Sequence, residues 1–211
     1  MIRSADWYFD FVSPYSYLQF KHFHRLPASL KINLVPVLFA GLLNHWGHKG
    51  PAEIPSKRVE MYRYCHWYAS RLGVPFRTPP AHPFNPLKVL RLTMALNSDH
   101  KTVETIFDHI WGQGHDIHSE DGFASLVDRL NVADVDQKIS SAGVKQALRD
   151  NTEQAVALGI YGTPTFVIDD MLFWGFDRTE MLLEYLDDPG LFETEEMDRL
   201  ADIPMAAERR R

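Results

Sequence analysis

Hydrophobic and polar residues follow two kinds of pattern along the chain. Residues 7–12 are a dense run of aromatic and β-branched side chains, which predicts a buried strand. Residues 31–38 alternate between apolar and polar and predict a second strand. Between them, Ser13 can act as a helix N-cap and Pro14 fits the first helical position, so we expect a helix that runs to about residue 26. This order predicts a βαβ unit with two parallel strands.

The middle of the chain has a helical pattern. Residues 44–55 are rich in Gly, Pro and His and predict a long loop, and residues 73–86 form a proline-rich connection. From about residue 41 to 155 we expect helices and no strand. The expected helices cover residues 55–72, 87–96, 103–111, 119–130 and 144–158.

Strand character returns at residues 165–169 and 171–174, where Asp169-Asp170 gives a tight-turn signal. A helix with an apolar face is expected after Asp177. After Pro189 the chain turns polar, which leaves open a docked short helix or a loose tail. The order βαβ, helices, ββα therefore indicates an α/β fold with an inserted block of helices.

Composition restricts the class of protein. The chain has 211 residues and a net charge of −6, which argues against nucleic acid as a partner because phosphate binding needs a basic face. The single cysteine, Cys65, cannot form an intrachain disulfide. The N-terminus lacks the pattern of a secretory signal, and no apolar run is long enough to span a membrane. We expect a cytoplasmic protein that binds neither nucleic acid nor membrane.

The first motif with chemical potential is DFVSPYSY, residues 10–17. It puts the Ser13 hydroxyl where a strand turns into a helix, and the free N–H groups and dipole of a helix start favour an anion there. Ser13 could donate a hydrogen bond to that anion, or it could be an ordinary helix cap.

Two further motifs lie near the C-terminus. In GTPTF, residues 162–166, a cis peptide before Pro164 would let the Thr163 backbone face outward and bind another peptide; otherwise this proline starts an edge strand. In FWGFDR, residues 173–178, the Asp177 carboxylate could accept an ammonium group or simply cap the following helix.

Together the motifs resemble a thioredoxin-like family within the disulfide-oxidoreductase-A-like superfamily. This family holds 2-hydroxychromene-2-carboxylate isomerase and the kappa-class glutathione transferases. The resemblance extends to about residue 187 and is carried by YFDFVSPYSY, GHKGPAEIPSK, PFNPL and GIYGTPTFVIDDMLFWGFDR. It implies a thioredoxin-like fold with an inserted all-helical domain. The thioredoxin-like domain would comprise residues 1–40 and 156–187, the helical insertion domain residues 41–155, and the C-terminal tail residues 188–211.

The resemblance also implies roles at matching positions. Ser13 corresponds to the family's catalytic serine, which hydrogen-bonds the sulfur of glutathione. Thr163 precedes the family's cis-proline and would pair its backbone with the cysteinyl part of the tripeptide. Phe176 and Asp177 match the pair that holds the γ-glutamyl end, and Lys57 matches a lysine that reaches the glycyl carboxylate.

The chain departs from the family at His48, where the family often has Asn; an imidazole can still donate a hydrogen bond. The isomerase's substrate-contacting residues do not match clearly, so the resemblance leaves the second substrate open. His22-x-His24 and His45-x-x-His48 lie on different elements without a completing Cys or carboxylate, so we expect no metal site.

The resemblance implies a glutathione-dependent isomerase, in which the thiolate of glutathione adds reversibly to a conjugated aromatic keto acid and glutathione is regenerated. The rivals are a kappa-like glutathione transferase or peroxidase, and a non-catalytic thioredoxin-fold binding protein. A disulfide oxidoreductase needs a Cys-x-x-Cys pair, and residues 13–16 read SPYS. Relatives commonly form homodimers, so a homodimer is expected.

Overall fold

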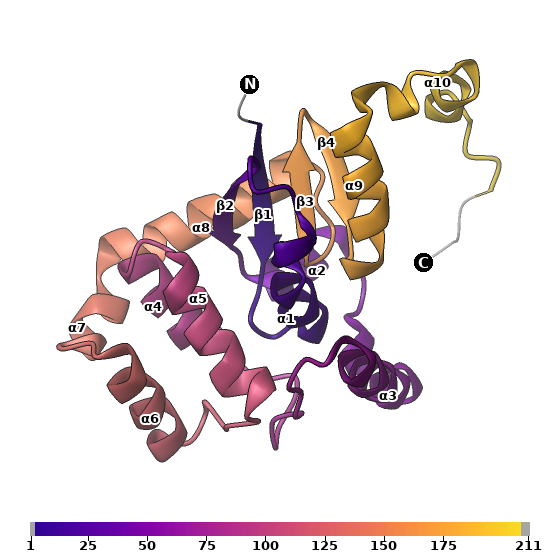
Figure 1. Cartoon of the computed structure of the whole chain (residues 1–211). Helices are drawn as coiled ribbons and strands as arrows, with labels where there is room; N and C mark the ends of the chain where they lie inside the picture. Colours follow the sequence, from indigo (N-terminus) through magenta and orange to yellow (C-terminus); the bar gives the residue numbers. More distant parts are fainter. Residues whose placement is uncertain (1–2, 208–211) are drawn as a thin grey trace.

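A mixed sheet of four strands lies at the centre of the computed structural model, which describes residues 3–207 (Figure 1). The strands are β1 (Ser4–Phe9), β2 (Lys31–Pro36), β3 (Thr165–Ile168) and β4 (Met171–Trp174), in the order β2-β1-β3-β4. β1 and β2 run parallel, and β3 is antiparallel to both β1 and β4. The predicted parallel pair and the C-terminal hairpin are confirmed.

The aromatic run in β1 divides its side chains between the two faces of the sheet. Trp7 and Phe9 are fully buried in the larger hydrophobic core, where their rings stack with centroids 4.6 Å apart. Tyr8 points to the other face and packs in a smaller cluster with Leu42 and Ala155. β1 ends at Phe9, three residues before the predicted end, because the following residues already form the turn into the first helix.

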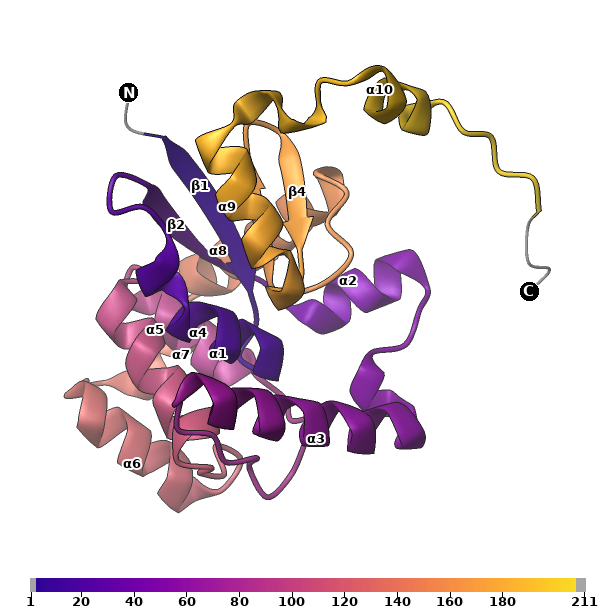
Figure 2. The ribbon, with the colours of Figure 1, turned by 45° about the vertical axis from the view of Figure 1, so that its right-hand side comes forward.

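Helices cover both faces of this sheet, as Figures 1 and 2 show. Helix α1 begins at Pro14 as predicted but ends at Lys21, and a 3₁₀ turn continues it. The other helices are α2 (Phe39–Trp46), α3 (Pro55–Leu72), α4 (Leu87–Ala95), α5 (His100–Phe107), α6 (Glu120–Leu130), α7 (Val135–Ser140), α8 (Ala142–Ala157), α9 (Thr179–Asp187) and α10 (Glu195–Ala201). No strand occurs between residues 41 and 155, all of which the structure describes. The sequence did not predict α7, and part of α2 lies where a loop was expected.

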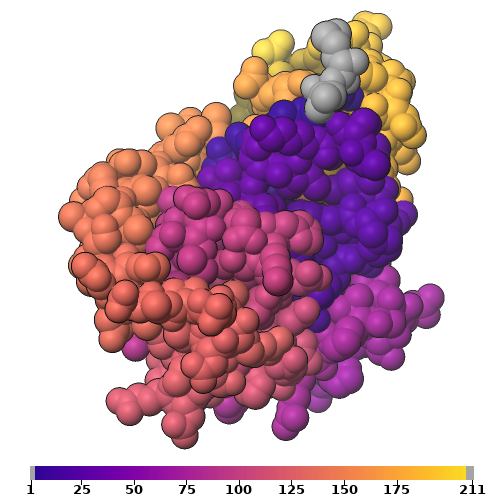
Figure 3. Space-filling model, turned by 60° about the vertical axis from the view of Figure 1, so that its left-hand side comes forward, coloured from indigo at the N-terminus to yellow at the C-terminus, as the bar shows by residue number. Residues whose placement is uncertain are grey.

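The helices of the middle segment share one hydrophobic core with the sheet. Phe107, at the end of α5, packs against Phe9 at 5.7 Å and against Phe11 at 4.7 Å between ring centroids. The space-filling view in Figure 3 shows the magenta and orange helices packed directly against the indigo N-terminal segment. The loops that follow β1 are therefore supported from the helical side of the molecule.

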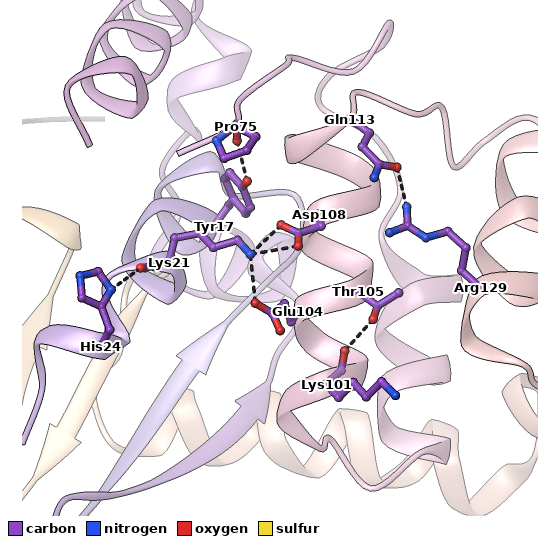
Figure 4. A network of polar contacts seen from close by, with 10 residues as sticks. All are labelled: Tyr17, Lys21, His24, Pro75, Lys101, Glu104, Thr105, Asp108, Gln113 and Arg129. Atoms are coloured by element: carbon purple, nitrogen blue, oxygen red, sulfur yellow. Dashed lines mark hydrogen bonds and ion pairs between the residues drawn. The ribbon is translucent and has the colours of Figure 1, made fainter. Parts of the chain in front are cut away.

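An ion-pair network ties α1 to this helical side (Figure 4). Nζ of Lys21 lies 3.1 Å from Glu104 and 2.8 Å from Asp108, whose backbone belongs to a π-helix, Asp108–Gly112, that continues α5. The hydroxyl of Tyr17 donates to the carbonyl of Pro75 at 2.6 Å. These contacts fix the orientation of the helix that begins next to Ser13.

As far as residue 207, the C-terminal segment is docked only at its beginning. A 3₁₀ turn, Pro189–Phe192, places the ring of Phe192 on Tyr185 at 5.7 Å between centroids. Helix α10 has no buried residue and projects from the body (Figures 1 and 2). Residues 208–211 of the expected tail lie outside the described residues. Within residues 3–207, no helix has both the length and the apolar character needed to cross a membrane.

Candidate functional site

One large cavity lies at the edge of the sheet where β1, β2 and β4 end and β3 begins. Its volume is about 890 Å³, near the upper end of the range for small-molecule sites. The six residues singled out in the sequence all line it: Ser13, His48, Lys57, Thr163, Phe176 and Asp177. Ser13 and Asp177, which lie 164 positions apart in the sequence, thus contribute to one cavity.

Ser13 is the N-cap of α1, as predicted, and it is buried. Its Oγ accepts a hydrogen bond from the backbone N–H of Ser16 at 3.2 Å. Its hydroxyl donates to the carbonyl of Thr163 at 3.3 Å. The oxygen of Ser13 thus caps the helix while its proton goes to the Thr163 carbonyl, which a ligand acceptor would have to replace.

Each of the three backbone carbonyls that precede Ser13 accepts a hydrogen bond. The carbonyl of Asp10 accepts from the Ser13 N–H at 3.1 Å. The carbonyl of Phe11 accepts from Nε1 of Trp111 at 2.8 Å, and that of Val12 accepts from Nε2 of His82 at 2.8 Å. Trp111 and His82 both come from the helical middle segment, so this segment positions Ser13.

His82 is neutral in this arrangement. Because a carbonyl can only accept, Nε2 carries the proton, and Nδ1 faces the Tyr62 hydroxyl at 2.8 Å. Burial lowers the pKa of His82, an effect that the Val12 carbonyl opposes and the charge of Arg58 reinforces. No local pattern could point to His82, since its importance arises from a contact with a residue 70 positions away.

Thr163 lies opposite Ser13, and the peptide between Thr163 and Pro164 is cis. Thr163 is buried, yet its Oγ1 has no hydrogen-bond partner among the described residues. An unsatisfied buried hydroxyl of this kind is destabilising. The expected edge strand after Pro164 is wrong: β3 lies between β1 and β4, and the Pro164 carbonyl accepts from the N–H of Gly175.

Phe176 and Asp177 form a 3₁₀ turn directly after β4. Phe176 is buried and makes an edge-to-face contact with Tyr68, with ring centroids 4.7 Å apart. Asp177 is exposed and pairs with Arg178. The prediction that Asp177 caps the following helix is wrong, because Arg178 occupies the N-cap position and makes no side-chain capping bond.

His48 and Lys57 lie at the mouth of the cavity on exposed positions. His48 follows α2, which ends at Gly47 in the left-handed conformation with φ 63°. Lys57 belongs to the first turn of α3. The cationic Lys57, the imidazole of His48 and the Asp177 carboxylate thus line the same cavity.

A buried carboxyl group, Asp10, also lines the cavity and was not assigned a role from the sequence. It has no exposed surface, and burial raises its pKa to about 7 despite the N–H groups of Phe39, Val12 and Phe11 that bond it. Its only sequence signal was its place in the DFVSPYSY motif.

The chain resembles known proteins over nearly its full length. The family described as DSBA-like thioredoxin domain matches residues 5–187. The sequence is 29% identical over 209 residues to "Glutathione s-transferase kappa 2" of Caenorhabditis elegans, covering 89% of this chain and 93% of that protein. It is 26% identical over 195 residues to "2-hydroxychromene-2-carboxylate isomerase" of Sphingobium xenophagum, covering 88% and 99%.

Among solved structures, a 2-hydroxychromene-2-carboxylate isomerase superposes with a TM-score of 0.76 at 21% identity, over 96% of this chain and 100% of that chain. This likeness bears on the fold, and it agrees with the α/β, thioredoxin-like architecture predicted from the sequence. The chain therefore belongs to the DSBA-like thioredoxin domain family.

Proposed function

We propose that this chain is a glutathione-dependent isomerase of the 2-hydroxychromene-2-carboxylate type. The observation that carries the proposal is the convergence of Ser13, Thr163 and four ligand-binding candidates on one cavity. Bound glutathione would supply a thiolate that adds reversibly to a conjugated double bond of an aromatic keto acid. The protein's part is to bind the tripeptide, orient it and stabilise negative charge on sulfur.

In this proposal Ser13 is the catalytic residue. A free thiol has a pKa of about 8.5 and is only slightly ionised at neutral pH. A hydroxyl donor at a helix N-terminus favours the ionised form. A hydrogen bond to a charged group contributes roughly 1.5–3 kcal/mol, which corresponds to about ten- to a hundredfold in rate if it is fully expressed in the transition state.

The remaining side chains would recognise the two ends of the tripeptide. Asp177, with the backbone at Phe176, would hold the γ-glutamyl ammonium end, and Lys57 and His48 would hold the glycyl carboxylate. The cavity is lined by the carboxylate of Asp177 and the cationic Lys57, which suit the ammonium and carboxylate groups of the tripeptide. The backbone of Thr163, next to the cis peptide, would face the cysteinyl part.

A kappa-like glutathione transferase or peroxidase is the second candidate, supported by the 29% identity to the Caenorhabditis elegans kappa protein. Net consumption of glutathione with an electrophilic nitroaromatic halide identifies a transferase. Conversion of 2-hydroxychromene-2-carboxylate with full recovery of glutathione identifies an isomerase.

The decisive variant is Ser13→Ala. We expect turnover to fall by about tenfold or more, because the donor to sulfur is lost. Ser119→Ala is the matched control, since Ser119 caps α6 in the same way, accepting from the N–H of Gly122 at 3.0 Å, but does not line the cavity. Both variants lose a cap worth about 1 kcal/mol, and only Ser13→Ala should lose activity.

Equal turnover in the two variants contradicts the catalytic role of Ser13. Failure of calorimetry to detect glutathione binding contradicts the proposal as a whole.

A further inference from the structure

The carboxyl group of Asp10 joins two walls of the cavity. Oδ1 accepts the backbone N–H of Val12 at 3.0 Å, within the turn that carries Ser13. Oδ2 accepts the backbone N–H of Phe39 at 2.8 Å, at the first residue of α2. One buried side chain therefore connects the end of β1 with the start of the helix that follows β2.

Helix α2 depends on this connection at its N-terminus. Its N-cap residue, Leu38, has no side-chain acceptor of its own, so Asp10 takes the place of a local cap. The N–H of Leu38 itself is satisfied by Oγ1 of Thr152 from α8 at 3.0 Å. Phe39 and Leu43 of α2 line the cavity, and His48 follows the helix. A shift at the start of α2 thus moves one wall of the site relative to Ser13.

We propose that Asp10 is a positioning residue whose ionised carboxylate clamps the Ser13 turn to α2 and so sets the shape of the glutathione site. This inference rests on the proposed function. The ionised form accepts both N–H groups fully. A protonated carboxyl carries its proton on one oxygen, which then accepts more weakly, and the clamp loosens.

The surroundings of Asp10 allow its carboxyl group to change protonation state within a pH range that experiments can reach. Burial raises its pKa to about 7, and the opposing influences are backbone N–H groups. Titratable side chains also line the cavity around it: His82, which bonds the neighbouring Val12, His48 and Lys49 after α2, Glu53 before α3, Lys57, Glu60 and Tyr64 on α3, Tyr15 on α1, Tyr161 before β3, and Asp177 after β4. On α8, the residue that faces this region is the uncharged Thr152.

Calorimetry with S-methylglutathione between pH 5.5 and 7.5 tests the clamp, because this probe has no thiol to titrate. We expect the affinity of the wild-type chain to rise about five- to tenfold over this range, roughly the value of one hydrogen bond. Asp10→Asn should bind about that much more weakly at pH 7.5 and lose most of the rise. Asp6→Asn is the matched control on β1, four residues before Asp10, since Asp6 bonds Asn33 and does not line the cavity.

The outcomes separate this inference from the proposed function. If Asp10→Asn binds the probe as tightly as the wild-type chain at every pH, the clamp is overturned and the glutathione site remains. If the wild-type chain binds no probe at any pH, both are overturned. If Asp10→Asn does not fold, nuclear magnetic resonance on the wild-type chain decides. The amide signals of Val12 and Phe39 should then titrate with one common midpoint, and two unrelated midpoints overturn the clamp.

Discussion

At the scale of single residues, Ser13 makes two hydrogen bonds at once, one as acceptor and one as donor. Its oxygen accepts the Ser16 N–H and caps α1, and its proton goes to the Thr163 carbonyl. A ligand sulfur has to replace that carbonyl as the acceptor. Ser13 therefore contributes the bond to a charged sulfur less the bond to the carbonyl, which is smaller than the full value of the charged bond and favours the lower, about tenfold, end of the expected effect.

The raised pKa of Asp10 also predicts how the free energy of unfolding depends on pH. Its pKa is about 7 in the folded chain against 3.8 for an ordinary Asp, so the folded state holds the proton more tightly. Its stabilising contribution is full below pH 4 and is lost as the pH rises to about 7. The free energy of unfolding should fall over this window by at most about 4 kcal/mol, at about 1.4 kcal/mol per pKa unit.

The measurement is urea unfolding of wild type and Asp10→Asn from pH 4 to 8. The difference between the two curves is needed because His109 acts in the opposite direction: burial lowers its pKa to about 4, so its contribution is present above pH 6.5 and lost on acidification. A wild-type minus variant difference that does not change with pH would show that Asp10 stays ionised.

At the scale of elements, local signals explain which boundaries could be predicted. Helix α3 has its predicted bounds because Pro55 starts it and Gly73, at φ 66°, ends it. Ser119 caps α6 as expected. Helix α2 was partly missed because its cap comes from Asp10, 29 positions earlier, and no local pattern can report such a contact.

The same limit applies to the site. The six candidate residues could be named because their motifs resemble those of a known family, and the structure brings all six to one cavity. Asp10 and His82 could not be assigned in this way. Their roles lie in bonds to backbone groups of distant segments, which depend on tertiary packing and leave no spacing pattern in the sequence.

The Lys21 network in Figure 4 gives a prediction for α1. Lys21→Met removes the partner of Glu104 and Asp108 from a largely buried position. We expect a loss of about 1–3 kcal/mol in the free energy of unfolding, the usual effect of leaving a partly buried charge without its partner. The comparison is Arg199→Met, which breaks an exposed pair with Glu196 on α10 and should leave the urea midpoint unchanged. Equal midpoints for Lys21→Met and wild type would show that the network contributes little.

At the scale of the whole molecule, the sheet, the middle helices and the first part of the C-terminal segment form one body. Aromatic contacts join β1 to α5, and hydrogen bonds from Trp111 and His82 hold the Ser13 turn. The segment after α9 contributes through Leu191 and Phe192, which pack against the core. Helix α10 adds no buried side chain.

Two C-terminal truncations test which part of the segment after α9 contributes to stability. A chain that ends at Thr194 should keep the melting temperature and activity of the full chain, because residues 195–207, the described part of what it lacks, bury no side chain. A chain that ends at Asp188 loses the packing of Leu191 and Phe192 and should be less stable by about 2–4 kcal/mol. Thermal unfolding followed by circular dichroism measures both, and equal melting temperatures for the two chains would contradict the docking of Phe192.

The walls of the cavity are contributed by residues as far apart as Asp10 and Asp177. Any small molecule seated there is held by nearly the whole length of the polypeptide, so its binding free energy is added to the resistance of the entire fold against heat. At a ligand concentration a hundred times the dissociation constant, this gain is about 2.7 kcal/mol. A library of conjugated aromatic acids, screened by melting temperature in the presence of glutathione, would therefore rank candidate substrates before any reaction has been assigned.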